Sequence, residues 1–574
     1  MNRESIRLKL TAALCSLLPI WSHAQDISQI AKSDPLIITG AVGTQNTYHS
    51  STNGYGYAAP WSSMFYANLN VSLYGMSMPF SISYSNTNWD YNYPYFSLSL
   101  SPSYKNWTGY IGQSSMNMST YVMNMGFNGV GVEYADKRFR SGLFYGVLRK
   151  AINDDPTDPM ARSPQMKRLG WGFKVGYGSS SHFLDLYLLR AYDCPSSVDE
   201  HWRSRLGAPQ ENIVVGVRGG TAPFRWLSFT ANAAVSAFNT DKDAPKISTE
   251  DTQKFETLFT TRYSSLARFA GDVSANLNLG AFNASLSYRM IQPDYTSLGT
   301  YYMSNNYHSL GITLSTSLLN RIALSATFNG QKDNLTKKQL YTTKGYVYGV
   351  YASTRLDQHL SLSAGFNGYL QDQGDGTMAV TDTSRVHRVM SSLTFSPSWM
   401  TSTENFDHMV TLSTAYTSNK DLNDFSNGES DVKSLSLGLG YDIGVKPWGV
   451  NFILSANHQE SKGYKSKYRS DIGSLGVSRS FLKEKNLNLS LTGSLCYNEV
   501  VGQSKSLSMG GNMSCGFTVK DVHVFSAQAS LYKYGDVNLS KVRSGLDDTD
   551  VSVSLSYVYT FTLLDMKRKA EKKQ

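Results

Sequence analysis

The sequence predicts an all-β fold, a single transmembrane antiparallel β-barrel. Three observations predict it: apolar and polar residues alternate along most of the chain, the polar positions carry mainly small uncharged side chains, and the alternating segments are long. The composition agrees, because 41% of the residues are hydrophobic but only 17% are charged, and there are 46 glycines and 37 tyrosines. No linker, composition shift or repeat divides the 574 residues, so we expect one continuous architecture instead of several soluble domains.

The first 24 residues have the pattern of an export signal. A basic head precedes the apolar stretch from Leu10 to Ile20, and Ser22-His23-Ala24 offers small residues for cleavage before Gln25. A short membrane anchor is the alternative, but the apolar stretch is well below the roughly 20 residues that a spanning helix needs. The sequence therefore predicts a signal peptide at 1–24, a short periplasmic N-terminal segment at 25–35, a transmembrane barrel at 36–564 and a basic periplasmic tail at 565–574.

The last alternating segment shows why a membrane is expected. Small polar residues separate its apolar ones, with Val558 as the exception, and period two places each class on its own face of a strand. A soluble sandwich shows the same alternation. However, its strands are mostly five or six residues long, whereas these run to about ten to fourteen, and a tilted membrane strand needs about 9 to 11. We expect seven residues of this final strand to face lipid: Val551, Val553, Leu555, Tyr557, Tyr559, Phe561 and Leu563.

Short connections alternate with longer stretches along the chain, as periplasmic turns alternate with external loops in outer-membrane barrels. Twelve turns that each join two strands, with a first strand near 36–47 and a last at 551–564, predict about 26 strands, between 24 and 28. The twelve short connections are Gly75, 105–107, 135–137, 178–181, 221–226, 279–282, 319–321, 356–358, 400–406, 446–449, 482–486 and 520–522. Both termini are then expected in the periplasm.

A barrel of this size needs an account of its lumen. Barrels of 16 to 18 strands leave an aqueous channel, and 22-stranded transporters carry a plug. Only about ten residues separate Gln25 from the first predicted strand, so we expect no N-terminal plug domain. The external loops look too short to seal a round barrel. A flattened barrel, a lumen filled by a partner and a large gated passage all remain open.

Charged residues on the polar faces are mixed in sign, which argues against a simple ion-selective pore. By alternation, seven candidates point into the lumen: Glu133, Lys174, Asp185, Arg218, Arg268, Asp272 and Arg289. Some of them are placed to pair across neighbouring strands, such as Arg268 and Asp272 with Arg289 or Arg218. We favour the interpretation that these are solvated charges that support the wall over the interpretation that they form a row of binding sites for a passing substrate. Charged pairs on polar faces are common without a function.

The net charge is +9, and removal of the signal, with three basic residues and one acidic residue, leaves +7. Much of this excess lies in the tail "DMKRKAEKKQ". After a lipid-facing strand we expect the tail at the periplasmic rim, near lipid head groups or an acidic partner, or solvated without a partner. We expect outer-membrane lipids as partners and no nucleic acid, and the oligomeric state is left open.

The sequence carries no motif of enzyme chemistry. It lacks G-x-S-x-G, a P-loop, H-E-x-x-H and paired C-x-x-C, and its histidines are scattered singly. The stretches "NDDPTDP" and "QDQGDGT" lack the ligand spacing of a calcium loop and indicate turns. Cys194, Cys496 and Cys515 remain after cleavage, and alternation puts Cys496 and Cys515 on opposite faces, so no bridge is expected between them. We expect no catalytic, metal-binding or cofactor-binding residues.

Five segments resemble known proteins: "QPDYTSLGTYYMSN" at 292–305 with the alternating "NYHSLGITLSTSLLNRIALSATFNGQKDNL" at 306–335 after it, "ITGAVGTQNTYHSS" at 38–51, "SLYGMSMPFSISYSN" at 72–86 and "SLSPSYKNWTGYIG" at 99–112. They are similar to segments of large, functionally uncharacterised outer-membrane barrel proteins of the Bacteroidota. The resemblance implies an outer-membrane barrel of a Gram-negative bacterium and carries no catalytic residues with it. The plug and energy-coupling segment of TonB-dependent receptors are not found in the sequence, which argues against active uptake.

Three functions follow from these expectations. The first is a non-enzymatic scaffold or conduit that works with lipoprotein or periplasmic protein partners, with an accessory role in export or assembly suggested by analogy alone. The second is a porin-like channel for small polar solutes. The third is a membrane enzyme at the barrel rim, which would require His and Asp or Ser to converge in space.

Overall fold

The computed structural model describes residues 36–52, 60–86, 96–154, 162–203, 205–247, 258–319, 321–381, 383, 385–426, 428–482, 486–536 and 548–565. The predicted signal peptide at 1–24, the segment at 25–35 and all of the basic tail except Asp565 lie outside these residues.

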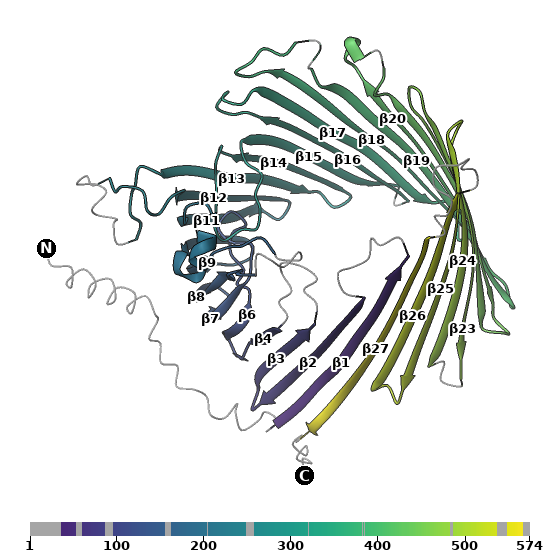
Figure 1. The fold of residues 1–574 in the computed structure, drawn as a ribbon, viewed down its shortest axis with the longest axis horizontal. Coiled ribbons are helices and arrows are strands. Elements are labelled where there is room, and N and C mark those ends of the chain that lie inside the picture. Colours follow the sequence, from purple (N-terminus) through teal and green to yellow (C-terminus); the bar gives the residue numbers. More distant parts are fainter. Residues whose placement is uncertain are drawn as a thin grey trace.

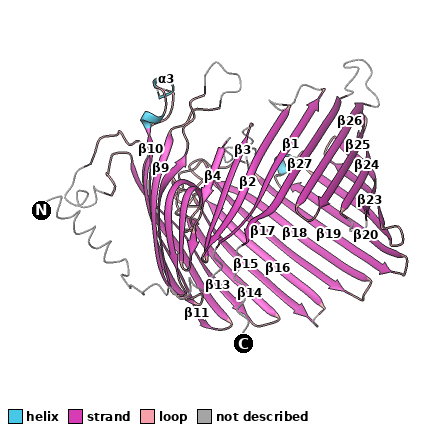
Figure 2. Ribbon diagram, turned by 90° about the horizontal axis from the view of Figure 1, so that it is seen from below, coloured by secondary structure: helices cyan, strands magenta, loops and turns pink. Residues whose placement is uncertain are grey.

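Most described residues belong to strands that are joined edge to edge in a single sheet (Figures 1 and 2). The first half of the sheet consists of β1 (Leu36–Ser51), β2 (Trp61–Leu73), β3 (Met76–Ser85), β4 (Phe96–Leu100), β5 (Ser103–Tyr104), β6 (Trp107–Ser114), β7 (Phe127–Ala135), β8 (Phe139–Arg149), β9 (Lys167–Gly178), β10 (His182–Cys194), β11 (Glu211–Phe224), β12 (Leu227–Asn239), β13 (Ser265–Asn278) and β14 (Phe282–Ile291).

The second half continues in chain order with β15 (Tyr307–Leu318), β16 (Ile322–Asp333), β17 (Tyr341–Arg355), β18 (Leu360–Asp375), β19 (His387–Ser402), β20 (Phe406–Asp421), β21 (Val432–Val445), β22 (Val450–Lys462), β23 (Lys467–Phe481), β24 (Leu487–Val500), β25 (Ser504–Val519), β26 (His523–Asp536) and β27 (Asp548–Asp565). The helical elements of the described residues are η1 (Pro195–Ser197), α3 (Glu200–Arg203) and η2 (Asp424–Ser426). No helix in this described part of the chain is long and apolar enough to cross a membrane.

The sheet closes as an antiparallel barrel of 26 strands, as the sequence predicts. β4 and β5 count as one strand, since both pair with β3 on one side and with β6 on the other. Pro102 lies between them, and proline has no N–H to give to a sheet ladder. Its carbonyl oxygen still accepts a hydrogen bond from the Gly109 N–H at 2.7 Å. The interruption is therefore local and leaves the barrel wall continuous.

The first and last strands close the barrel (Figure 1). β1 and β27 pair along most of their length, from Ile37 opposite Asp565 to Ser51 opposite Asp550. One irregularity interrupts the pairing, because Ile38 lies opposite Leu564 while Thr39 lies opposite Thr562. Leu563 is left over as the extra residue of a β-bulge and is 70% exposed.

Short turns alternate with longer loops around most of the barrel, although the connections after β22 (463–466) and β24 (501–503) are also short. The twelve predicted turns each join two neighbouring strands of the sheet. The turn at Tyr74 and Gly75 has only two residues. Both have positive φ, 48° and 83°, as a type I′ hairpin turn requires. In the turn after β7, the backbone N–H groups of Phe139 and Arg138 donate to Asp136 at 2.6 and 2.7 Å. These bonds hold the pKa of Asp136 below its usual range.

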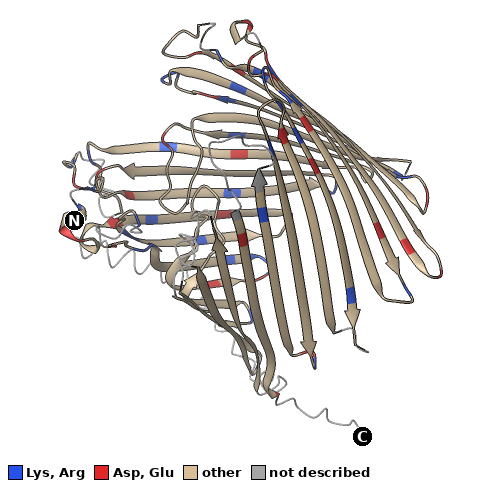
Figure 3. Ribbon diagram, turned by 45° about the vertical axis from the view of Figure 1, so that its right-hand side comes forward, with Lys and Arg blue, Asp and Glu red and all other residues tan. Residues whose placement is uncertain are grey.

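The register also assigns the two faces of the wall, because residues opposite each other in an antiparallel pair point to the same side. Followed from strand to strand, the face that carries Asp272 is also the face of Ser554 and Ser81, whereas Leu555 lies on the opposite face. The face of Leu555 carries most of the large exposed apolar side chains, and most of each strand is uncharged (Figure 3). In a barrel wall this apolar face lies outside and the face of serines, glycines and charges lies inside.

The outward face of β27 carries Val551, Val553, Leu555, Tyr557, Tyr559 and Phe561, while Leu563 lies in the bulge. Aromatic rings gather near the short-turn end of this strand. His523 stacks on Tyr559 with ring centroids 4.6 Å apart, and Phe525 lies 4.7 Å from Tyr557. Such aromatic girdles are typical of the membrane interface.

Candidate functional site: a loop layer on the inner wall

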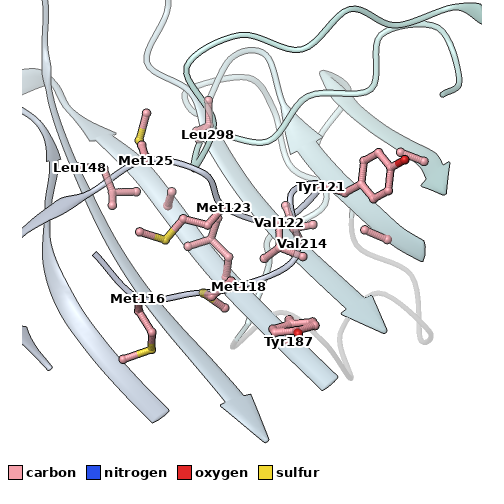
Figure 4. Packing of buried hydrophobic residues seen from close by; sticks show 14 of the residues in the cluster. Met116, Met118, Tyr121, Val122, Met123, Met125, Leu148, Tyr187, Val214 and Leu298 are labelled. Atoms are coloured by element: carbon pink, nitrogen blue, oxygen red, sulfur yellow. The ribbon is translucent and has the colours of Figure 1, made fainter. Parts of the chain in front are cut away.

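Two external loops fold against the inner face of the wall from β7 to β14. The first comprises residues 115–126, between β6 and β7, and the second comprises residues 292–306, between β14 and β15. We call them together the loop layer. Figure 4 shows the first loop crossing over the neighbouring strands. The loop layer carries the main apolar core of the described residues, on the side of the wall that is otherwise polar.

The first loop is unusually apolar for a connection between strands. Its buried apolar members are Met116, Met118, Tyr121, Val122, Met123 and Met125, all at most 8% exposed. They pack against inward side chains of the wall, among them Phe144, Tyr187, Leu189 and Val214. Methionine side chains adapt to irregular gaps, which suits a loop that lies across several strands. Burial of this apolar surface fixes the loop against the wall.

Hydrogen bonds tie the first loop to inward polar groups of three strands. The Tyr121 hydroxyl donates to the carboxylate of Asp272 on β13 at 2.6 Å, and Ser119 Oγ donates to Asn232 Oδ1 on β12 at 2.7 Å. Lys174 on β9 donates to the Asn117 carbonyl oxygen at 3.0 Å. These contacts place the loop on three strands at once.

The second loop packs onto the first. Tyr295 is only 1% exposed, and its hydroxyl donates to the Tyr121 carbonyl oxygen at 2.9 Å. Ser297 Oγ donates to the Val122 carbonyl oxygen, and Met123 and Gly299 form a parallel β-bridge. Two segments more than 170 residues apart in sequence therefore form one unit.

Glycines in the wall make room for this unit. A Cβ at Gly216 on β11 would lie 2.5 Å from Val122 Cγ2, and a Cβ at Gly142 on β8 would lie 3.0 Å from Met116 Sδ. Within the layer, a Cβ at Gly299 would lie 2.4 Å from Leu189 Cδ2. Real Cβ atoms do not approach as closely as 2.5 Å, so a larger residue at Gly216 or Gly299 would force the layer and the wall apart. At Gly142 the flexible Met116 side chain would have to shift.

Five of the seven predicted lumen charges lie in ion pairs or register pairs that the structure shows. Lys174 Nζ lies 2.6 Å from Glu133 Oε1, across the intervening strand β8. Asp185 accepts from Arg140 at 2.8 Å, a partner that alternation alone did not single out. Asp272 lies directly opposite Arg289, one of the two partners expected for it.

The remaining two arginines have other neighbours than those expected. Arg268 donates to the Pro293 carbonyl oxygen at 2.9 Å and lies 3.9 Å from Asp294, both in the second loop. The Arg218 guanidinium lies 5.5 Å from the ring centre of Phe183. Together these charges brace the inner wall and the loop layer, and they are not arranged as a ladder of unpaired charges for a substrate.

Two parts of this site escaped the sequence analysis. One is a cluster at the external end, where the buried Arg168 donates to Asp193 at 2.8 Å and Arg149 reaches the same carboxylate at 3.1 Å. Arg168 shares the face of Lys174, and Asp193 shares that of Asp185, so alternation would have found them. The other is the loop layer itself, whose only signal is the methionine-rich stretch "MNMSTYVMNM" in a predicted loop.

The opposite inner wall, around β17 to β25, differs in chemistry. Serine hydroxyls meet across strands at Ser455 and Ser474 (2.6 Å), Ser490 and Ser514 (2.7 Å), and Ser361 and Ser398 (2.8 Å). Hydroxyls that face a lumen bind water and polar solutes without a preference for charge. The lumen is therefore bounded by a charged, loop-covered wall on one side and a wall rich in neutral hydroxyls on the other.

The rim enzyme expected as the third function would need converging catalytic groups. His458 and Asp471 do meet on the outer face, at 2.5 Å. Their neighbours in the same row of strands are Leu437 and Tyr497, so no serine or cysteine lies beside the pair in that row. Among the described residues, no three or more His, Cys, Asp and Glu side chains gather as a metal site, and the three described cysteines are free.

The closed antiparallel barrel has an apolar outer face, a polar inner face, aromatic residues at one interface, and short turns on one edge with mostly longer loops on the other. These are the features of a barrel of the outer-membrane type. The chain is therefore an outer-membrane β-barrel. Barrels of this type lie in the outer membrane of Gram-negative bacteria.

No protein-family model matches the sequence, and no curated protein matches it either. The comparison with solved structures found likenesses of low identity and low TM-score. OccAB2 of Acinetobacter baumannii is 10% identical over 62% of this chain and 93% of its own, with a TM-score of 0.31. The translocation pore of the P pilus usher PapC is 10% identical over 92% of this chain and 100% of its own (TM-score 0.34), and OpdO of Pseudomonas aeruginosa is 10% identical over 69% and 98% (TM-score 0.32). These likenesses are too low to assign a function, which is argued below from the barrel itself.

Proposed function

We propose that this barrel is a non-enzymatic conduit or scaffold in the outer membrane and that it works with lipoprotein or periplasmic protein partners. The observation that carries the proposal is the combination of 26 strands with a loop layer on the wall from β7 to β14. Barrel width grows with strand number, and barrels of 16 to 18 strands already enclose a channel. A barrel with the circumference of 26 strands is wider than a small-solute channel needs, which favours a protein-sized cargo or occupant.

The loop layer supports a role in passage over a role in catalysis. Its apolar side chains in residues 116–125 are buried, and Tyr121 and Tyr295 are held by hydrogen bonds, so this part of the layer offers a fixed shape to whatever lies in the lumen. The inward carboxylates Glu133 and Asp185 are already held by Lys174 and Arg140. A general acid or base needs a free group with a perturbed protonation state, and these pairs do not provide one.

A porin-like channel for small polar solutes is the second candidate. The serine pairs of the opposite wall favour it, because a neutral hydroxyl-rich lining passes polar solutes of either charge. The two candidates differ in what the purified protein does alone. A partner-dependent conduit co-purifies with another protein, whereas a porin is complete as it stands.

The test is extraction of the tagged full-length protein from its own outer membrane in mild detergent, followed by mass spectrometry and planar-bilayer recording. A stoichiometric lipoprotein or periplasmic protein that remains bound, and that reduces the conductance of the isolated barrel when added back, supports the conduit. An isolated barrel with large, steady conductance and no bound protein supports the porin instead. Assignment of the chain to the Bacteroidota and the predicted signal peptide are parts of the same proposal, tested by the organism of origin and by the N-terminus of the mature protein.

A further inference from the structure

A row of three lysines crosses the outer face near the external loops. Lys433 on β21 lies directly opposite Lys462 on β22, and Lys462 lies directly opposite Lys467 on β23. Like charges in this position destabilise a sheet. Lys467 has a carboxylate nearby, Glu460 at 2.8 Å, whereas neither Lys433 nor Lys462 has an ion-pair partner within the described ranges. We call the three the lysine row. It leaves an excess of positive charge that an external anion would neutralise.

Further polar side chains lie on the same outer face below the lysine row. Glu460 lies opposite Arg469, and one pair further toward the middle of the strands His458 lies opposite Asp471. The next pair is Ala456 opposite Gly473, where the outer face becomes apolar. The surface thus changes from cationic to polar to apolar along two neighbouring strands.

An apolar groove of about 990 Å³ begins at that point and crosses the outer face from β21 to β25. Glycines on three adjacent strands form its floor: Gly473, Gly493 and Gly511. Its sides are leucines and a methionine that are about half exposed, among them Leu439 (52%), Leu475 (56%) and Leu491 (55%). A smaller groove of about 460 Å³ joins this floor to His458 and Asp471.

The glycines of the floor are not required by the wall. A Cβ at Gly473, Gly493 or Gly511 would meet nothing within 4 Å, and none of the three has a positive φ. Glycine in a strand interior also weakens the strand. These residues therefore differ from the wall glycines under the loop layer, and their effect is to hollow the lipid-facing surface at mid-height.

The spacing between the lysine row and the groove matches half a bilayer. Gly473 follows Lys467 by six residues, about 20 Å along a strand. At the usual strand tilt of about 45°, this places the glycine about 14 Å deeper in the membrane. Half of the hydrocarbon core is about 15 Å. When the glycine floor lies near the bilayer centre, the lysine row lies at the level of the outer head groups.

We propose that this surface is a binding site for an anionic, phosphate-bearing acyl lipid of the outer leaflet. The phosphate lies at the lysine row and an acyl chain fills the groove over the three glycines. The charge excess and the apolar hollow are continuous along β22 and β23, which a lipid with a charged head and a straight chain matches. The site is independent of the proposed conduit function, because it lies on the outer face of the wall.

The test uses the full-length protein, delipidated in detergent, and native mass spectrometry with diphosphorylated lipid A, phosphatidylethanolamine and inorganic phosphate as separate probes. The variant replaces the lysine row (K433S, K462S and K467S). The matched control replaces Lys332 and Lys344, two outward lysines that lie opposite each other on β16 and β17 without such a groove. Loss of three lysine contacts to an anionic head group should weaken lipid A binding roughly 100-fold, and the control should bind like the wild type.

A second variant tests the groove. Gly493→Leu fills the hollow and is expected to weaken lipid A binding roughly tenfold, as loss of buried chain surface predicts. Gly516→Leu is its control, since Gly516 faces the lumen and also has open space around it. Equal binding of lipid A and phosphatidylethanolamine, unchanged binding in both variants, or binding of inorganic phosphate without the lipid would overturn the proposal. So would a dimer of this chain that is lost in Gly493→Leu, because it would assign the groove to self-association.

Discussion

Substitution of Gly216 by valine should detach the loop layer from the barrel wall. The Cβ of the new residue would lie 2.5 Å from Val122 Cγ2. The Val122 side chain extends from the loop toward β11 and has no exposed surface. The wall backbone is fixed by its hydrogen bonds to β10 and β12, so the loop must move. Overpacking of this kind costs typically about 1–3 kcal/mol. The barrel strands themselves should remain intact.

That free energy converts into a measurable rate. If the layer opens and closes faster than it is modified, the modification rate follows the open fraction, and about 1–3 kcal/mol raises that fraction about 5- to 150-fold. Methionine oxidation by peroxide is a suitable probe, because Met118 and Met123 are 7% and 2% exposed in the closed layer. Peptide mass spectrometry gives the oxidation rate of each residue separately.

The control is Gly516→Val, an inward glycine of β25 where an added Cβ meets nothing within 4 Å. It should leave the oxidation rates of Met118 and Met123 at the wild-type level. If Gly216→Val oxidises no faster than the wild type, or if the two variants accelerate oxidation equally, the loop layer is not packed against the wall as described.

Other substitutions test the remaining contacts. Tyr121→Phe removes the hydroxyl that donates to Asp272 and should raise the same oxidation rates about 10- to 150-fold, since a hydrogen bond to a charged group contributes about 1.5–3 kcal/mol; unchanged rates would show that the bond is dispensable. Glu133→Ala leaves the largely buried Lys174 without its carboxylate and should destabilise the barrel by about 3–5 kcal/mol, read as a lower temperature for loss of the compact folded band on gels, with Glu133→Gln less affected. Leu555→Arg or Tyr559→Arg places a charge on the outer face at a cost of up to about 2–4 kcal/mol at mid-membrane and should reduce assembly, whereas normal folding of both would refute the face assignment. In the external loop after β8, hydrogen bonds from Arg162 lower the pKa of Asp154 to about 2, so this ion pair should persist as the pH falls from 7 and be lost only as the pH passes through about 2; in Arg162→Ala the carboxyl should titrate near 4, as carbonyl chemical shifts would report.

The alternation of apolar and polar residues was sufficient to predict the strands and their turns from the sequence, because it reflects a local rule. Each strand separates lipid from a wet interior, so every second residue is constrained whatever its neighbours are. The segment ending at Phe561 and the turn at Gly75 could be assigned without knowledge of their partners. The strand count followed, since it needs only the number of turns.

Features that depend on distant parts of the chain could not be assigned in this way. Nothing near Gly216 indicates that Val122 lies above it, because the pairing of a loop with a wall is set by the closed barrel. The interruption at Pro102 and the bulge at Leu563 depend on the register with neighbouring strands. Arg140 as the partner of Asp185 was missed because it lies two strands away.

The most direct test of the account is labelling of single cysteines on the final strand in reconstituted liposomes. Cys194, Cys496 and Cys515 are first replaced by serine, and one cysteine is then placed at Leu555 or at its neighbour Ser554. The account predicts that the cysteine at 555 reacts with a lipid-soluble probe and the cysteine at 554 with a membrane-impermeant thiol reagent that enters through the lumen. The reverse pattern, or reaction of both with the water-soluble reagent, would contradict an apolar face in lipid and a wet face inside.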